Sequence, residues 1–107
     1  MGWIGVDLDG TLAHYESWKG TDQIGEPVPA MLARVHKWIE QGKEVRIFTA
    51  RASVSEALPY IENWCQIHVG RTLPITNVKD FGMIELWDDR AVRVAMNTGE
   101  PCCNYEE

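Results

Sequence analysis

The sequence predicts an α/β fold, a Rossmann-like three-layer α/β/α sandwich with a mostly parallel sheet. Three observations predict it: short apolar segments alternate with amphipathic ones, glycine or proline separates them, and polar residues follow the apolar segments. Strands that alternate with helices pair in parallel through right-handed crossovers. With 107 residues, 45% hydrophobic and 24% charged, the chain is expected to form a single domain over residues 1–107.

The first half of the chain predicts one strand–helix–strand unit. Residues 3–8, WIGVDL, are typical of a short strand that is buried on both faces. Residues 10–26 are polar and lack a helical period, so we expect a long loop or small flap there. Residues 27–42 place apolar side chains at helical spacing, with a proline in the first turn and a glycine at the end. Residues 43–50, KEVRIFTA, then predict the second strand.

The second half predicts another helix and further short strands. Residues 53–70 begin with a capping-box pattern and continue with apolar side chains at helical intervals. Pro59 lacks a backbone donor, so this helix should start late or kink there. Residues 73–79 and 83–89 are expected to be strands, and residues 91–96 are a candidate for a last one.

Polar side chains follow each of the first four predicted strands. They are, in chain order, Asp7 and Asp9, Thr49, Lys79, and Asp88 with Asp89. The carboxyl ends of parallel strands converge on one crevice, which is where ligands bind in open α/β sheets. We therefore expect these side chains to form one functional site.

Carboxylates gathered in one crevice repel each other. The cost is about 1 kcal/mol per pair at about 4 Å in water, and about 4 kcal/mol in a partly buried site. Lys79 offers one compensating charge, and a divalent cation is the obvious second source. Oxygen ligands favour Mg²⁺ over a soft metal, and Mg²⁺ commonly binds one or two carboxylates together with substrate phosphate. The pattern is that of a phosphate-transfer site.

The order of these motifs resembles the haloacid dehalogenase (HAD) superfamily of phosphohydrolases. DLDGT, the threonine that ends RIFTA, a lone lysine and the DD pair occur in the family's order and span residues 4–90. The resemblance implies a HAD-like fold and a Mg²⁺-dependent phosphatase acting on a phosphomonoester. Neither gap between motifs has room for a cap domain, since domains typically need about 50 residues or more. The chain thus resembles the capless subgroup, whose open site implies a large substrate or a partner subunit acting as lid.

The resemblance also implies roles for the acidic residues. Asp7 would be the nucleophile that forms an aspartyl-phosphate, and Asp9 the general acid and base. The implied Mg²⁺ ligands are Asp7, the Asp9 backbone carbonyl, and the acidic pair. Within that pair, Asp88 is expected to be the direct ligand and Asp89 to lie behind it.

The remaining positions would contact the phosphorylated substrate. By resemblance, Thr49 hydrogen-bonds a phosphoryl oxygen and Lys79 balances its charge. Asp80 follows Lys79 in the sequence and offers it an alternative partner. Arg51 either binds phosphate or pairs with the surplus carboxylates. The residues expected to contact substrate are Gly10, Thr11 and Arg51.

Charge and composition narrow the function further. A net charge of −6 argues against non-specific nucleic-acid binding. No segment has the about 20 apolar residues of a membrane span, so we expect a cytoplasmic protein with its three cysteines as free thiols. Two other functions stay open, a receiver-like phosphoacceptor signalling domain and a non-catalytic HAD-like binding module. Nucleotides, macromolecular substrates and a homo-oligomer covering the open site also stay open.

Overall fold

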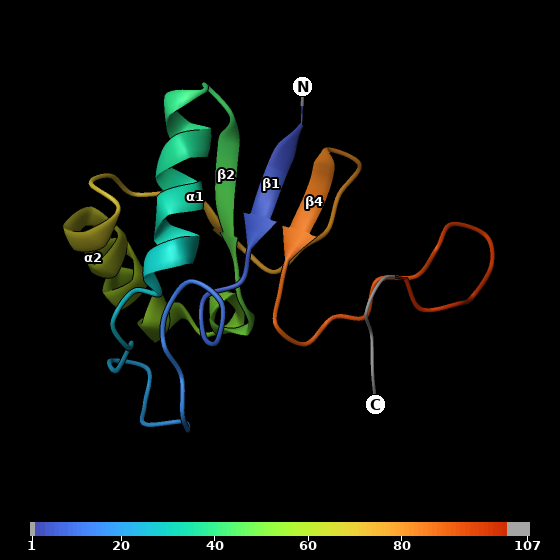
Figure 1. Cartoon of the computed structure of the whole chain (residues 1–107). Helices are drawn as coiled ribbons and strands as arrows, with labels where there is room; N and C mark the ends of the chain where they lie inside the picture. Colours follow the sequence, from blue (N-terminus) through green and yellow to red (C-terminus); the bar gives the residue numbers. More distant parts are fainter. Residues whose placement is uncertain (1, 103–107) are drawn as a thin grey trace.

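The computed structural model describes residues 2–102, which form an α/β fold with a parallel sheet (Figure 1). The strands are β1 (Trp3–Val6), β2 (Glu44–Phe48), β3 (Ile75–Thr76) and β4 (Met83–Trp87), and the α-helices are α1 (Pro29–Glu40) and α2 (Leu58–His68). Two 3₁₀ turns, Ala50–Ser53 and Ser55–Ala57, connect β2 to α2. The sheet has the order β3-β2-β1-β4, and every pair is parallel. The predicted α/β class and parallel sheet are therefore confirmed.

Both helices begin with a proline in the first turn, where its missing N–H costs nothing. Helix α1 buries Met31 and Val35, which lie four residues apart on one face. Helix α2 starts only at Leu58, because Pro59 cannot stand deeper in a helix without breaking it. This is the late start that the sequence predicts.

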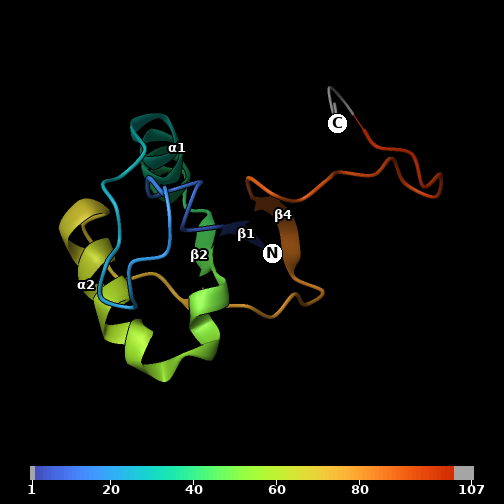
Figure 2. The same ribbon diagram turned by 90° about the horizontal axis from the view of Figure 1, so that it is seen from below.

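Both helices pack against the same face of the sheet, as Figure 2 shows. One buried cluster contains side chains of β1, β2 and both helices. Its members include Ile4, Val6, Val45, Ile47, Met31, Val35, Ile61 and Trp64. On the other face, Trp3 is buried by stacking on Phe48 and by the guanidinium of Arg46, which lies 4.4 Å from a Trp3 ring centroid.

Two expectations about the architecture differ from the structure. Residues 2–102 form no helix on the second face, so they make two layers of the expected three. Residues 91–96 are not a strand; their only ladder contact is an isolated bridge between Val94 and Pro101. Figure 1 shows this segment extending away from the sheet, so it has no strand beside it to pair with.

The strands all point the same way, and residues 10–26 lie beyond their carboxyl ends as the expected flap (Figure 1). No helix within residues 2–102 combines the length and the apolar character needed to cross a membrane. The sheet edge beneath the flap is where the polar motif residues follow β1, β2 and β4.

Candidate active site

Three carboxylates meet where β1 and β4 end side by side. The pairing of Val6 with Trp87 brings the next residues, Asp7 and Asp88, to the same edge. The Asp7 N–H donates to the Trp87 carbonyl over 2.9 Å, which fixes this register beyond the strands. One carboxylate oxygen from each of Asp7, Asp88 and Asp89 lies within 4.8 Å of the other two. The fold thus joins motifs from opposite ends of the sequence.

The turn after β1 is anchored by two buried leucines, which leave the polar residues between them at this edge. Leu8 and Leu12 are fully buried, and the Leu12 N–H donates back to the Leu8 carbonyl. Gly10 has φ +92°, and a Cβ there would lie 2.6 Å from the Asp89 Oδ2. Glycine is required at this position both by the backbone and by the close carboxylate.

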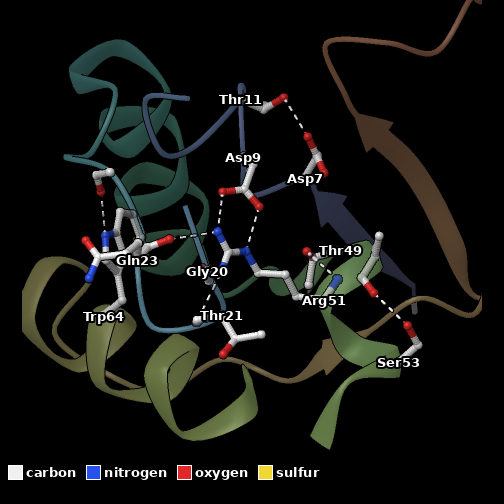
Figure 3. Close-up of polar contacts among 12 residues, drawn as sticks. Asp7, Asp9, Thr11, Gly20, Thr21, Gln23, Thr49, Arg51, Ser53 and Trp64 are labelled. Atoms are coloured by element: carbon white, nitrogen blue, oxygen red, sulfur yellow. Dashed lines mark hydrogen bonds and ion pairs between the residues drawn. The ribbon is translucent and has the colours of Figure 1, made fainter. Parts of the chain in front are cut away.

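The Thr11 hydroxyl lies between two of the acids. Its Oγ1 is 3.3 Å from the Asp7 Oδ2 and 3.3 Å from the Asp89 Oδ1 (Figure 3 shows the first of these contacts). A hydroxyl has one proton to donate, so Thr11 can satisfy only one of these oxygens at a time. Thr11, expected to contact substrate, is thus placed within the acidic cluster.

Burial, together with the neighbouring acids, raises the pKa of Asp7 from 3.8 to about 7. Burial is the largest cause, followed by a hydrogen bond with the Asp89 side chain and the negative charges of Asp88 and Asp89. The Thr11 hydroxyl acts in the opposite direction. The negative charges of Asp88 and Asp89 contribute to this shift after burial, and a cation bound among the three acids would offset their repulsion.

The acidic cluster fits a small hard cation. Oxygen ligands at about 2.1 Å from Mg²⁺ lie at most about 4.2 Å apart, and the three oxygens here lie within 4.8 Å of one another, so small side-chain movements would suffice to bind the ion. All three side chains offer carboxylate oxygens, which suit Mg²⁺ and exclude a preference for soft metals. The residues that would hold it are Asp7, Asp88 and Asp89. The Asp9 carboxylate, by contrast, pairs with Arg51.

Asp9 forms a bidentate ion pair with Arg51. The Arg51 Nε donates to the Asp9 Oδ2 over 2.8 Å, and Nη2 donates to Oδ1 over 2.9 Å (Figure 3). The Arg51 side chain is 5% exposed and that of Asp9 is 21% exposed, so water screens this pair little. Of the two roles left open for Arg51, the structure shows pairing with a carboxylate.

The same guanidinium fastens the flap. Its Nη1 donates to the Thr21 carbonyl over 3.1 Å, and its Nη2 donates to the Gln23 carbonyl over 2.8 Å (Figure 3). The guanidinium carbon also lies 4.7 Å from the centroid of a Trp18 ring. A single buried cation therefore holds both Asp9 and the loop that covers it.

A cleft of about 680 Å³ opens beside the carboxylates. Its volume is within the range of about 300–1,000 Å³ usual for small-molecule sites. Its acidic lining comprises Asp7, Asp9, Asp88 and Asp89, and its basic lining comprises Arg51 and Arg90. Tyr15, Trp18, Phe48 and Val54 contribute an aromatic and apolar part. The cleft therefore combines charged and aromatic lining residues.

Two predicted phosphate-binding residues lie outside this lining. Thr49 is 3% exposed, and its hydroxyl accepts the Arg51 backbone N–H over 3.1 Å, which caps the 3₁₀ turn. Lys79 is exposed and lines a neighbouring groove that shares Asp88 with the cleft. Both residues lie near the site, but neither side chain joins the acidic cluster.

Sequence reasoning missed Asn77, which lines the cleft. The predicted strand over residues 73–79 is too long at both ends, since β3 spans Ile75–Thr76. Asn77 is the first residue beyond the true strand end. With the strand end placed correctly, the same rule that selected Thr49 after β2 would have selected Asn77.

We expect Gly10→Ala to weaken Mg²⁺ binding, because the added methyl group would displace Asp89. The left-handed backbone should also cost about 1–2 kcal/mol of folding free energy. Gly70→Ala is a matched control, since Gly70 has φ +96° with nothing within 4 Å of an added Cβ. Urea unfolding should show similar losses in both variants, whereas Mg²⁺ titration calorimetry should show weaker binding in Gly10→Ala alone. Equal Mg²⁺ affinity in the two variants would contradict this account of the turn.

Comparison with family models, with curated proteins and with solved structures gave no match. The resemblance to the HAD superfamily therefore depends on the motif residues alone.

Proposed function

We propose that this chain is a Mg²⁺-dependent phosphatase of HAD type that hydrolyses a phosphomonoester through an aspartyl-phosphate on Asp7. The observation that carries the proposal is the meeting of Asp7, Asp88 and Asp89 at one sheet edge, with Asp9 in the same cleft. Carboxylates held close together repel each other, and such clusters with a raised pKa are typical of functional sites. The HAD-like fold is part of the proposal, and the all-parallel sheet supports it.

The proposed chemistry divides hydrolysis into two displacements. In the first, an Asp7 oxygen attacks phosphorus, the bond to the leaving oxygen breaks, and Asp9 gives that oxygen a proton. In the second, water attacks the phosphorus of the aspartyl-phosphate while Asp9 takes its proton. Inorganic phosphate leaves and Asp7 returns to a carboxylate. Since Arg51 donates to both oxygens of Asp9, the first step requires that Asp9 give up one of these hydrogen bonds to hold a proton.

Positive charge in the cleft would stabilise the phosphoryl oxygens. A divalent cation bound by the acidic cluster would supply the largest share of it. Arg90 is exposed at the cleft, and its guanidinium forms no ion pair within residues 2–102. We propose that Arg90 binds phosphate there, together with Lys79 from the neighbouring groove.

The decisive test is phosphate release from an aryl phosphate such as p-nitrophenyl phosphate. We expect turnover in Mg²⁺, a fall of at least about 100-fold on chelation with EDTA, and recovery on adding Mg²⁺ back. The same rate with and without EDTA would contradict the proposal. Glu62→Gln, which removes an exposed carboxylate from α2, should retain the rate and serves as the charge control.

The same experiment separates the enzyme from a phosphoacceptor switch. A phosphatase renews its nucleophile, so phosphate should accumulate well beyond one equivalent per chain. A chain that takes up one phosphoryl group from a small acyl phosphate and keeps it would instead support the receiver-like function. Intact-mass measurement after mixing with acetyl phosphate distinguishes the two outcomes.

A further inference from the structure

Two exposed aromatic side chains of the flap line the same cleft as the catalytic carboxylates. Tyr15 is 44% exposed and Trp18 is 56% exposed. Large aromatic side chains bury most of their surface in ordinary packing, so aromatic surface left open in a concave site is typical of ligand binding. The phosphatase chemistry proposed above uses neither residue.

The side chain of Arg51 holds Trp18 in position. The guanidinium carbon of Arg51 lies 4.7 Å from a ring centroid of Trp18, and Arg51 is itself fixed by Asp9. Because this cation covers one face of the indole, the exposed part of Trp18 is the remainder of the ring. A ring that is already oriented loses little conformational entropy when a ligand stacks on it.

The rest of the cleft suits a ring attached to a phosphate. Phe48 and Val54 extend the apolar lining, and Asn77 and Arg90 add hydrogen-bond donors. A polyol or a short alkyl phosphate would leave the aromatic surface uncovered, whereas a planar ring would cover it. Base–aromatic stacking contributes enough free energy, about 1–3 kcal/mol per base, to decide between these substrates.

We infer that the substrate is a phosphomonoester whose leaving alcohol carries a planar aromatic ring, a nucleoside monophosphate being the simplest case. The ring stacks on Trp18 while the phosphate lies against Asp7. The inference rests on the proposed phosphatase function for the phosphate end of the cleft. A free nucleotide is favoured over the end of a polynucleotide, because a net charge of −6 provides little attraction for a long phosphate backbone.

Binding to the Asp7→Asn chain in Mg²⁺ tests the inference without turnover. We expect adenosine monophosphate to bind at least about tenfold more tightly than glycerol 3-phosphate by equilibrium dialysis. Trp18→Ala in that background should remove about tenfold of the nucleotide affinity and leave glycerol 3-phosphate binding unchanged, while Trp18→Phe keeps a ring and should restore most of it. Unchanged glycerol 3-phosphate binding also shows that the Trp18 variants are folded at the site. Tyr60→Ala, an exposed aromatic outside the cleft, is the matched control.

The outcomes distinguish this inference from the phosphatase proposal. Equal affinities for the two probes, or no effect of Trp18→Ala, would overturn the inference even if both esters are hydrolysed. Tight nucleotide binding that depends on Trp18, in a chain that hydrolyses no phosphomonoester, would support ring recognition at Trp18 and refute the phosphatase. A 5′-phosphorylated oligonucleotide that binds at least about tenfold more tightly than the nucleotide would overturn the choice of a free nucleotide.

Discussion

Asp7→Asn is expected to abolish phosphate release and also to stabilise the protein above about pH 7 when no divalent cation is present. Removing a nucleophile that acts together with its acid/base partner should lower the rate by at least about 10⁴-fold. An amide at this position cannot form the aspartyl-phosphate, but it removes one charge from a crowded acidic cluster. A loss of activity caused by misfolding would lower stability, so the paired measurements separate the two explanations.

The direction of the stability change follows from the raised pKa of Asp7, which is about 7 in the folded protein against an ordinary 3.8. The folded state holds its proton more strongly than the unfolded chain does. This contribution is fully present below about pH 3.8, and it is lost as the pH rises through about 7. Because water reaches this half-buried carboxyl and screens it, we expect the loss to be about 1–2 kcal/mol.

Urea unfolding in EDTA between about pH 4 and pH 8 measures this loss. The wild-type chain should lose stability over this range, whereas Asp7→Asn should lose less and be the more stable of the two at the alkaline end. Glu62→Gln should follow the wild-type curve, since it removes a carboxylate far from the cluster. Parallel curves for wild type and Asp7→Asn would refute the assignment of a raised pKa to Asp7.

Arg51→Ala is expected to be the most destabilising single substitution in the cleft, with a loss of about 3–5 kcal/mol. It removes the partner of the Asp9 carboxylate, which is only 21% exposed, and it removes donors from the Thr21 and Gln23 carbonyls. A loss of this size is a large part of the about 5–15 kcal/mol that stabilises a typical domain. Arg51→Lys keeps the charge without the bidentate geometry, so its stability should lie between those of the wild type and Arg51→Ala.

Two measurements test this role of Arg51. Urea unfolding should show the loss, while Arg90→Ala, an exposed arginine in the same cleft, should change stability by less than about 0.5 kcal/mol. Limited trypsin digestion should cut after Lys19, within the flap, faster in Arg51→Ala than in the wild type. Equal cleavage rates at Lys19 would show that the flap is held by other contacts.

The meeting of the acidic motifs could be predicted from the sequence because a parallel sheet aligns its strand ends. Predicting that Asp7 and Asp88 meet requires only that both follow parallel strands. The pairing of Val6 with Trp87 confirms that they follow paired residues. The partner of Arg51 could not be predicted in this way. It depends on the 3₁₀ turn Ala50–Ser53, whose course sets where a long side chain ends. Sequence reasoning could only leave pairing and phosphate binding as alternatives.

Residues 91–96 show another limit of sequence patterns. Their apolar, β-branched composition is typical of a strand, but a strand also needs a neighbour with free backbone groups. The chain leaves the sheet directly after β4 and extends away from it (Figure 1). The expected helical layer on the second face is also missing from residues 2–102, because the connection from β3 to β4 contains no helix. Composition cannot show where a segment lies relative to its partners.

Arg51 contacts Asp9, Trp18 and the flap carbonyls, so in the proposed mechanism ligand contact at the flap would be linked to proton transfer by Asp9. A ligand that pulls Trp18 or the Gln23 carbonyl toward itself changes how strongly the guanidinium holds Asp9. By reciprocity, any change in how strongly Arg51 holds Asp9 must change the affinity for that ligand by the same factor. Contacts made by the flap and contacts made by Asp9 therefore respond to each other through one side chain.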